Sequence, residues 1–436
     1  MPFSSHGLHE TPGSAGGRRP RLLLVAYLCS PYRGSEQGVG WQRAVQAARF
    51  MDTWVLCKQQ RSEEDIARFL AEHGPIPGLR FSYLPLTAPE LLLKIIPGFF
   101  FLAYHLWQRR AYRRALALHR ELAFDLAHQV TIGSFREPGY LWKLGIPFVW
   151  GPIGGTQNYP ASMFPMAGLR GTIAESARTL LNRLQLRFTP RIRKAVARAD
   201  ILLAANSTGA RELERRFHRK ATLELDVGCT ALGPEKPPRG KRSGRELRIL
   251  WSGVFGHRKA LHVLLHALAG VGPPTAYTLR ILGSGPLGRK WRRLALRLGV
   301  DRHCQWLGWL TLEEVREHYL WADVFAFTSL RDTCGTVVLE ALSNGVPVVC
   351  LDHQGAGDVV SPSCGVKIPV TDPATVIRGF RQALVDLGTD PARLEELSRG
   401  ARERAREYLW DRKGEKMAAL YRSVIAGVGA GSRETT

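Results

Sequence analysis

Apolar and polar positions along this chain alternate in a repeating order of short buried strands and amphipathic helices. The clearest unit surrounds residues 325–352, where two apolar runs, VFAF and VPVVC, flank a helical segment. That segment begins after Gly335 and ends at Gly345, and a glycine after the last helical residue, with Pro347 just beyond, is typical of a helix end. The order of strand, helix and strand predicts an α/β protein with parallel strands.

The carboxyl end of the first strand in this unit carries the main candidate site. Gly335 and Thr336 form the helix start there, and the free N–H groups of a helix start favour a phosphate. Glu340 lies one turn further along on the same face, so its carboxylate is directed back toward the helix start, where ribose hydroxyls would suit it. Asp332, in the preceding loop, adds a second acid. The alternative is that Glu340 is a solvated helix residue and Asp332 a turn former.

At these residues the chain resembles the family-4 retaining glycosyltransferases, whose signature here is E-x7-E followed by a helix, a glycine and an apolar strand. Asp332 stands in place of the first Glu, and Glu340 matches the second. The resemblance implies the GT-B fold, in which two Rossmann-like domains face each other across an interdomain cleft. It also implies that Asp332 contacts the transferred sugar and Glu340 the ribose, and that the donor phosphate takes the proton of the acceptor.

A second loop resembles the donor side of the same family. Gly253 matches the first glycine of the family pattern GR…KG and Lys259 matches its lysine, while Val254 stands at the usual arginine position and Ala260 at the second glycine. We expect Arg258 to compensate for the missing arginine, because an arginine fork beside an ammonium group can clamp a diphosphate.

A literal G-x-G-x-x-G follows at Gly283, Gly285 and Gly288, between a predicted strand and a predicted helix. Alone, this motif indicates a dinucleotide site, so an NAD-dependent oxidoreductase is one alternative function. The acid expected about 20 residues further on, at the end of the next strand, is absent. The same glycines resemble the family's turn beside the donor nucleotide, where we expect Gly283 and Gly285 to bind the donor.

The first half of the chain supplies the predicted acceptor side. Its candidates are two glycines in the loop that opens the first helix, an Arg–Glu pair and a Gly–Gly segment, namely Gly38, Gly40, Arg136, Glu137, Gly154 and Gly155. Glycines let a backbone approach a ligand closely, although an ordinary strand-to-helix turn has the same spacing. His128 is expected at a strand end facing the cleft, as a catalytic candidate, and a satisfied core histidine is the alternative.

A Pro, Gly and charge-rich segment at 233–246 marks a change in composition that predicts a domain boundary. We expect a disordered tail at 1–20, an N-terminal Rossmann-like acceptor domain at 21–235, a linker at 236–246, a C-terminal Rossmann-like donor domain at 247–405 and a final helix at 406–426. The final helix resembles the family's C-terminal helix, which crosses back to the first domain. The apolar run after Arg21 imitates an export signal, but the bulky residues at its end favour a retained strand.

The chain is strongly basic, with a formal net charge of +23 and a pI near 10.2. This charge indicates an anionic partner: nucleic acid, an anionic membrane or a phosphorylated substrate. Residues 91–120 join an apolar run to a basic helix without acids, and residues 166–220 hold thirteen Lys and Arg against four acids. The first segment favours an anionic membrane surface. The second suits a lipid headgroup or a diphosphate-linked acceptor, with a solvated basic face as the alternative. For the first segment, a buried helix with a basic face or a membrane span is the alternative. Few aromatic residues in 166–220 disfavour nucleic-acid binding by stacking.

Seven scattered cysteines without a C-x-x-C pair favour free thiols in a reducing cytoplasm. The sequence has no D-x-D motif, so we expect no metal and no cofactor beyond a nucleotide-sugar co-substrate. The resemblance therefore predicts a retaining, metal-independent glycosyltransferase, peripheral on the inner face of the cell membrane. Its acceptor would be a saccharide or lipid-linked molecule in cell-surface polysaccharide or glycolipid synthesis. A non-catalytic basic protein that binds membranes or nucleic acid is the second alternative.

Overall fold

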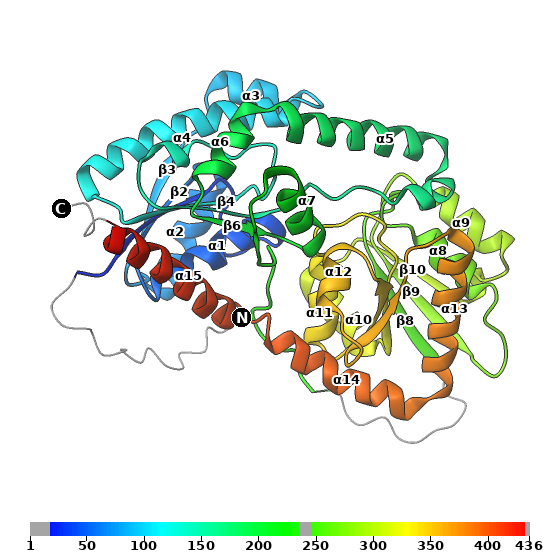
Figure 1. The fold of residues 1–436 in the computed structure, drawn as a ribbon. Coiled ribbons are helices and arrows are strands. Elements are labelled where there is room, and N and C mark those ends of the chain that lie inside the picture. Colours follow the sequence, from blue (N-terminus) through cyan, green and yellow to red (C-terminus); the bar gives the residue numbers. More distant parts are fainter. Residues whose placement is uncertain (1–17, 236–245, 432–436) are drawn as a thin grey trace.

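The computed structural model describes residues 18–235 and 246–431, which form two α/β domains (Figure 1). The predicted tail at 1–20 and the predicted linker at 236–246 lie outside the described residues, except for residues 18–20 and Glu246. Within the described ranges, no helix is both long enough and apolar enough to cross a membrane.

The N-terminal domain is built on a parallel sheet of seven described strands in the order β3-β2-β1-β4-β5-β6-β7. The strands are β1 (Arg21–Ala26), β2 (Asp52–Lys58), β3 (Leu79–Leu84), β4 (Leu126–Thr131), β5 (Phe148–Ile153), β6 (Ile201–Ala204) and β7 (Thr222–Leu223). The helices are α1 (Ser35–Ala48), α2 (Arg61–His73), α3 (Ala88–Ile95), α4 (Phe100–Leu122), α5 (Phe164–Phe188), α6 (Pro190–Arg198) and α7 (Ser207–Phe217). Strands β4 and β5 are buried along their whole length, as central strands of a parallel sheet covered on both faces should be.

The C-terminal domain repeats this plan with six described parallel strands in the order β10-β9-β8-β11-β12-β13. The strands are β8 (Leu247–Ser252), β9 (Tyr277–Leu282), β10 (Cys304–Gly308), β11 (Val324–Phe327), β12 (Val348–Leu351) and β13 (Gly365–Ile368). The helices are α8 (Leu261–Leu268), α9 (Gly288–Arg297), α10 (Leu312–Trp321), α11 (Thr336–Ser343), α12 (Gln354–Val359), α13 (Pro373–Thr389), α14 (Pro391–Arg406) and α15 (Trp410–Gly431). The strand order reverses between β8 and β11, and open parallel sheets bind ligands beside such a reversal, at the carboxyl ends of the strands.

The last two described helices pack on different domains. Helix α14 packs on α11 of the C-terminal domain, and α15 returns to the N-terminal domain, where it packs on α1. A buried ion cluster joins α15 to this domain. Glu224 Oε1, just after β7, lies 2.7 Å from Arg43 Nη2 in α1 and 2.6 Å from Lys413 Nζ in α15. Burial alone would raise the pKa of Glu224, but the two cations outweigh it and lower the pKa to about 2.

Apart from the crossing before α5, the chain passes between the domains at two described places that lie side by side. The first is the segment around Cys229 and the second is the junction of α14 and α15. The Cys229 N–H donates to the Tyr408 carbonyl at 2.8 Å, and the Trp410 N–H donates to the Cys229 carbonyl at 3.0 Å. The two passages are therefore hydrogen-bonded to each other.

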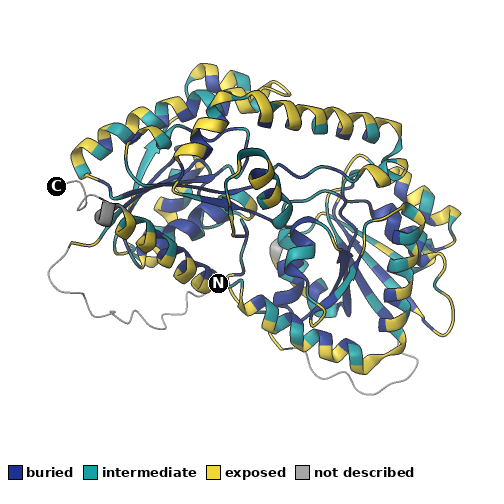
Figure 2. Cartoon of the chain, viewed as in Figure 1, coloured by how far each residue is buried: buried dark blue, intermediate teal, exposed yellow. Residues whose placement is uncertain are grey.

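Helix α5 reaches from one domain to the other along one side of the molecule (Figure 1). Tyr159 and Met163, just before it, and Phe164 at its start pack into the core of the C-terminal domain. Near its other end, Leu186 packs into the core of the N-terminal domain. Between these ends the helix is largely exposed, as Figure 2 shows.

Candidate interdomain active site

The helix start predicted to hold a phosphate lies at the carboxyl end of β11. Helix α11 begins at Thr336, and Gly335 before it has a φ of 83°. A Cβ at Gly335 would lie 2.8 Å from the Phe327 ring, and this backbone conformation is one that other residues rarely adopt, so position 335 requires glycine. The first N–H groups of α11 have no helical carbonyl partner, so they can donate to a ligand.

Asp332 forms a charged cluster with the two residues predicted to clamp the diphosphate. Its Oδ2 pairs with Lys259 Nζ and lies 3.2 Å from Arg258 Nη1. Its backbone N–H donates to Gln354 Oε1 at 2.7 Å, and this contact fixes the loop. Burial alone would raise the pKa of Asp332, but Lys259 and then Arg258 outweigh it and lower the pKa. The structure thus brings all three predicted residues together.

Glu340 lies on α11 one turn after Thr336, as predicted. Its Oε2 accepts a hydrogen bond from the Tyr319 hydroxyl of α10 at 3.0 Å. Burial raises the pKa of Glu340 above its ordinary value, and the bond from Tyr319 opposes this shift. The residue is therefore anchored at the helix start, and its contact with a ribose stays a prediction.

The predicted donor glycines bring two loops into backbone contact. A Cβ at Gly283 would lie 2.1 Å from the Gly253 carbonyl oxygen, and a Cβ at Gly285 would lie 2.8 Å from the Phe255 nitrogen. The Phe255 N–H donates to the Ser284 carbonyl at 2.8 Å. These glycines therefore let the loop after β9 support the loop that carries Arg258 and Lys259, and contact with the nucleotide stays a prediction.

On the N-terminal side, the Gly–Gly segment after β5 meets the loop that carries Asp332. A Cβ at Gly154 would lie 3.0 Å from Thr333 Cγ2, so a larger residue would press on the opposite domain. Asn206 Nδ2 also donates to the Thr333 carbonyl, at 2.8 Å. Gly155 is the next residue, and its carbonyl accepts from Arg178 Nη2 at 3.0 Å. Both predicted glycines therefore lie where the domains touch.

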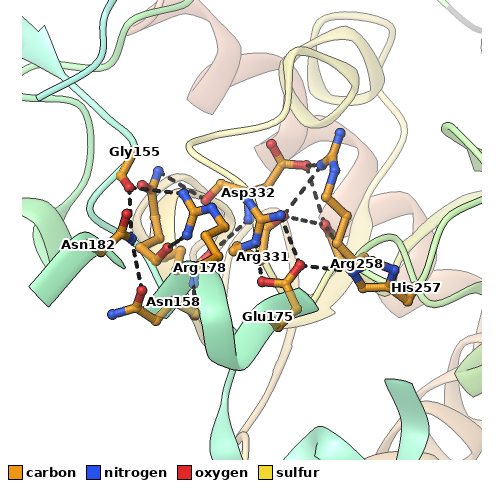
Figure 3. A network of polar contacts seen from close by, with 12 residues as sticks. Gly155, Asn158, Glu175, Arg178, Asn182, His257, Arg258, Arg331 and Asp332 are labelled. Carbon is orange, nitrogen blue, oxygen red and sulfur yellow. Dashed lines mark hydrogen bonds and ion pairs between the residues drawn. The ribbon is translucent and has the colours of Figure 1, made fainter. Parts of the chain in front are cut away.

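Sequence reasoning missed a buried acid that links α5 to the C-terminal domain (Figure 3). Glu175 accepts two bonds from Arg331, one from Nε at 2.8 Å and one from Nη2 at 2.9 Å. Its Oε1 also lies 2.9 Å from His257 Nε2. Burial would raise the pKa of Glu175, but Arg331 and His257 outweigh it and lower the pKa. One signal was available, because Glu175 is the single acid in residues 166–199.

Two arginines face this acid from the N-terminal domain, Arg136 after β4 and Arg178 on α5. Arg136 Nε donates to Gln185 Oε1 at 2.9 Å, and its Nη2 donates to Asn182 Oδ1. Arg178 was not among the predicted residues. We call the region formed by Arg136 and by residues 154–158, 175–182, 257–259 and 331–336 the interdomain site.

Two further carboxyl groups lie beside the interdomain site. Burial, and secondarily the charge of Asp226, raises the pKa of Glu36 at the start of α1 to about 7, while a bond from the Gly133 N–H opposes the shift. Burial raises the pKa of Asp226 to about 6, and the charge of Asp332 adds to this effect against Lys413. Among the described residues, no group of three or more His, Cys, Asp or Glu is arranged to hold a metal ion.

His128 does not face the interdomain site, so the prediction of a catalytic histidine at a strand end is wrong. The residue lies within β4 and has no exposed surface. Its Nδ1 lies 2.7 Å from the Tyr421 hydroxyl of α15 and its Nε2 lies 2.8 Å from the Gly151 carbonyl. Burial, and then the charge of Arg43, lowers the pKa of His128 to about 3. It is a neutral core histidine, the alternative given by the sequence.

Two other acceptor-side predictions place their residues wrongly. Glu137 is 2% exposed, and its Oε2 lies 2.9 Å from Arg191 Nη2 and 3.0 Å from His105 Nδ1, inside the N-terminal domain. Gly40 is buried, and a Cβ there would lie 2.0 Å from the Leu28 carbonyl oxygen. A Cβ at Gly38 would lie 2.7 Å from the carbonyl oxygen of Arg33 in its own loop. Gly40 therefore fits α1 against neighbouring backbone, as in an ordinary strand-to-helix turn, and contact of Gly38 with an acceptor stays a prediction.

Comparison with known families identifies the C-terminal half of the chain. The family model described as "Glycosyl transferases group 1" matches residues 234–406. A D-inositol 3-phosphate glycosyltransferase from Streptomyces bingchenggensis is 27% identical over 252 residues, which cover 53% of this chain and 54% of the relative. The chain thus spans about half the length of the curated relatives it matches. Over residues 234–406, this match agrees with the resemblance noted in the sequence.

Two solved structures share the fold over nearly the whole chain. The apo form of the lipopolysaccharide outer core galactosyltransferase WaaB superposes with a TM-score of 0.63 at 13% identity, covering 92% of this chain and 99% of that one. HepE of Anabaena in complex with UDP and glucose gives a TM-score of 0.57 at 14% identity, covering 93% and 100%. The predicted GT-B fold with two Rossmann-like domains is therefore confirmed.

Proposed function

We propose that this chain, whose residues 234–406 match the group 1 glycosyltransferases, moves a sugar with retention from a nucleotide-sugar to a saccharide or lipid-linked acceptor. The observation that carries the proposal is the cluster of Arg258, Lys259 and Asp332 beside the start of α11. A diphosphate bound there would meet two cations and the free N–H groups of Gly335 and Thr336.

These groups have defined tasks in the proposed reaction. Arg258, Lys259 and the start of α11 stabilise the charge that develops on the nucleoside diphosphate as the bond to the sugar breaks. We assign this task to the cations rather than to a metal ion, because the sequence has no D-x-D motif. The donor phosphate takes the proton of the attacking acceptor hydroxyl, so the step needs no side-chain base. Glu340 binds the ribose and Asp332 orients the sugar.

Before the donor binds, ion pairs with Asp332 already hold the side chains of Arg258 and Lys259 in place. Lys259 is nearly buried, and its ammonium group is paired with Asp332. A donor phosphate would replace the carboxylate as the partner of Lys259, which releases Asp332 to accept hydrogen bonds from sugar hydroxyls. Because the cations are already held in place, they need little reorganisation when the donor binds.

We also propose that the protein lies on an anionic membrane surface at the inner face of the cell membrane. Of the seventeen large apolar side chains exposed among the described residues, thirteen lie on two segments, α3 to the start of α4 and α5. They are Leu91, Leu92, Ile95, Ile96, Phe99, Phe101, Leu102, Leu169, Ile173, Leu180, Leu181, Leu184 and Phe188. We call them, with Lys94, Arg183 and Arg187, the α3–α5 surface.

The two segments of the α3–α5 surface lie on the same side of the molecule (Figure 1). Arg136 links them, because it lies over the Phe101 ring and bonds to Gln185 of α5. Exposed apolar side chains interspersed with cations suit the boundary between acyl chains and anionic headgroups. A lipid-linked acceptor held there would lie near the interdomain site, because α5 carries part of the α3–α5 surface and also Arg178 of the interdomain site.

A panel of nucleoside diphosphates and their sugars tests the glycosyltransferase proposal. One nucleoside diphosphate and its sugar should raise the unfolding temperature of the full chain, because a ligand that binds only the folded state stabilises it. Lys259→Ala should abolish most of the shift, and Lys416→Ala, an exposed lysine on α15, should keep it. Absence of a shift with every member of the panel would refute the proposal.

A further inference from the structure

The cations of the interdomain site are unequally paired. Arg331 is paired with Glu175, and Arg258 and Lys259 are paired with Asp332. Arg136 and Arg178 have no carboxylate within ion-pair distance among the described residues. Five basic side chains therefore meet two acids in this region, and the unmatched charge lies on the N-terminal side.

Neutral oxygens hold the two unmatched guanidinium groups in place. Arg178 donates to the Gln157 carbonyl at 2.7 Å and to the Gly155 carbonyl at 3.0 Å. Arg136 donates to the side-chain oxygens of Gln185 and Asn182 and lies 4.9 Å from the centre of the Phe135 ring. These contacts orient the two guanidinium groups and leave their charge unneutralised.

Asn182 is a buried residue that holds the Arg136 guanidinium group in position. Its side chain is 1% exposed, and its Nδ2 donates to Asn158 Oδ1 at 3.0 Å and to the Gly155 carbonyl at 3.3 Å. Because the amide nitrogen is committed to these acceptors, the amide oxygen must face Arg136. A buried amide used to orient an arginine indicates that the position of this guanidinium group matters.

Burial and neighbouring cations lower the pKa of both arginines. Burial, then the charges of Arg331 and Arg136, lowers the pKa of Arg178 to about 10. Glu175 opposes this shift, and Arg258 adds to it. Burial and the charge of Arg331 also lower the pKa of Arg136. Partly buried cations that repel one another are costly, and an anion bound between them would remove that cost.

The diphosphate of the donor would neutralise only part of the positive charge of the interdomain site. In the proposed function, the diphosphate of the donor binds to Arg258 and Lys259 in the C-terminal domain. Arg136 and Arg178 belong to the other domain, which is the acceptor side of the site. A phosphate ester carries about two negative charges at neutral pH and three acceptor oxygens, so it matches two guanidinium forks better than a single carboxylate does.

We propose that Arg136 and Arg178 form a binding site for a phosphate or diphosphate group of the acceptor. This inference rests on the proposed function, since it names the chemical class of the second substrate. It makes the acceptor an anionic molecule, and it makes these two arginines determinants of acceptor specificity. Discrimination against acceptors without phosphate would be strong, because such acceptors leave both guanidinium groups unpaired.

Calorimetric titration of inorganic phosphate into the full chain tests this site. The protein is first saturated with the nucleoside diphosphate that binds it best, which fills the donor clamp. Wild-type protein should still bind phosphate, and Arg136→Gln or Arg178→Gln should weaken that binding about 10- to 100-fold. Arg170→Gln, an exposed arginine on the same helix, is the matched control and should leave the affinity unchanged.

Three results would overturn the proposal. The first is that wild-type protein saturated with nucleoside diphosphate binds no phosphate. The second is that the Arg136→Gln and Arg178→Gln variants bind phosphate as tightly as wild type does. The third is that these variants lose affinity for the nucleoside diphosphate. The last result would assign the arginines to the donor and leave the glycosyltransferase proposal intact. If no nucleoside diphosphate binds at all, that proposal fails, and phosphate is titrated without nucleotide to decide the present one.

Two additions keep the test decisive. Arg178→Lys retains the charge without the fork, so it should bind phosphate more tightly than Arg178→Gln, and it replaces that variant if Arg178→Gln does not fold. A sugar phosphate and a short-chain prenyl diphosphate distinguish the two sources of the group. Tighter binding of one of them than of inorganic phosphate identifies the acceptor as a soluble phosphorylated saccharide or as a lipid-linked molecule.

Discussion

Glu175 of α5 and Arg331 of the C-terminal domain form a two-point ion pair, with Nε to Oε2 at 2.8 Å and Nη2 to Oε1 at 2.9 Å. The Glu175 side chain is 2% exposed and that of Arg331 21% exposed, so solvent screens the pair little. The pair closes one side of the interdomain site and fixes α5 against the loop that carries Asp332. Arg331 thereby connects the position of α5 to the donor cations (Figure 3).

Loss of this pair should destabilise the protein. Glu175→Gln removes the charge that Arg331 and His257 share, and the expected cost is about 3 kcal/mol of unfolding free energy. Chemical denaturation measures this change. Glu396→Gln, in the exposed pair with Arg393, is the control, and its effect should stay within about 0.5 kcal/mol. Equal stability of Glu175→Gln and wild type would show that the ion pair contributes nothing to the free energy of unfolding.

Lys259→Ala should weaken nucleotide-sugar binding by about 1 to 3 kcal/mol, because it removes a charge-assisted hydrogen bond to the diphosphate. Calorimetric titration measures this loss. Unchanged affinity would remove Lys259 from the donor site.

Asp332→Asn should affect turnover and nucleotide affinity in opposite ways. Turnover should fall, because the carboxylate is proposed to contact the transferred sugar. Free nucleoside diphosphate should bind at least as tightly as to wild type, because Lys259 and Arg258 no longer have a competing carboxylate. Product formation and calorimetry are measured on the same preparation. A variant with normal turnover would place Asp332 outside the reaction.

Glu340→Gln should lower both nucleotide-sugar affinity and turnover. The substitution keeps the size of the side chain but replaces charged acceptors for the ribose hydroxyls with a neutral amide. Tyr319→Phe is the matched comparison, because it removes the anchor of Glu340 and leaves the carboxylate in place. Its effect on affinity should be smaller. Full activity of both Glu340→Gln and Asp332→Asn would show that the active site lies elsewhere.

The stability of the protein should depend on pH through Glu36. Its pKa is about 7 in the folded protein, above its ordinary value, so the folded state keeps a proton that the unfolded chain has lost. The resulting stabilisation is complete below about pH 4.5 and is lost as the pH rises through 7. Glu36→Gln lacks this dependence, so its unfolding temperature relative to wild type should increase from pH 5 to pH 8.

The control for this experiment is Glu64→Gln, an acid exposed on α2. Asp226 faces Glu36 and titrates nearby, with a pKa of about 6, so the double variant with Asp226→Asn should flatten the profile further. A difference between Glu36→Gln and wild type that stays constant over this pH range would contradict the prediction.

The α3–α5 surface should bind anionic vesicles. Wild-type protein should co-sediment with vesicles that contain an anionic phospholipid and be released at high salt, because each basic residue near the surface contributes about 1 kcal/mol and is screened. Ile95→Ser with Leu169→Ser, at two positions that are each 77% exposed, should reduce the bound fraction without changing stability. Equal recovery with neutral and anionic vesicles would refute the membrane proposal, and a dimer in solution would assign the surface to a second copy.

The sequence predicted the elements that depend on local pattern. Gly335 and Glu340 lie at the start and on the first turns of α11, because glycine before a helix and helical spacing are local properties. The grouping of Asp332 with Arg258 and Lys259 in one site was also predicted, since the loops after β8 and β11 end at the same edge of one sheet, but their ion pairs were not. Local pattern together with parallel topology therefore located the donor side.

The acceptor side depends on contacts between distant segments, and there the sequence was a poor guide. His128 bonds to Tyr421, which is 293 residues away, so its neutral state in the core could not be read from β4. Glu175 pairs with a residue 156 positions further on, and nothing in the periodicity of α5 indicates that partner. Gly40 needs a small residue because of the Leu28 carbonyl, a reason that a glycine motif does not reveal.

The paired passages at Cys229 and Leu409 make that edge of the molecule a pivot. Any swing of one domain away from the other must rotate about it, and α5 lies on the opposite side (Figure 1). Rotation moves the far side most, so the Glu175–Arg331 pair separates first while the residues at the pivot stay together. The contacts that α5 and the segment before it make with the C-terminal domain therefore limit how readily the domains part to admit and release substrates. They include the Glu175–Arg331 pair and the packing of Tyr159 and Met163.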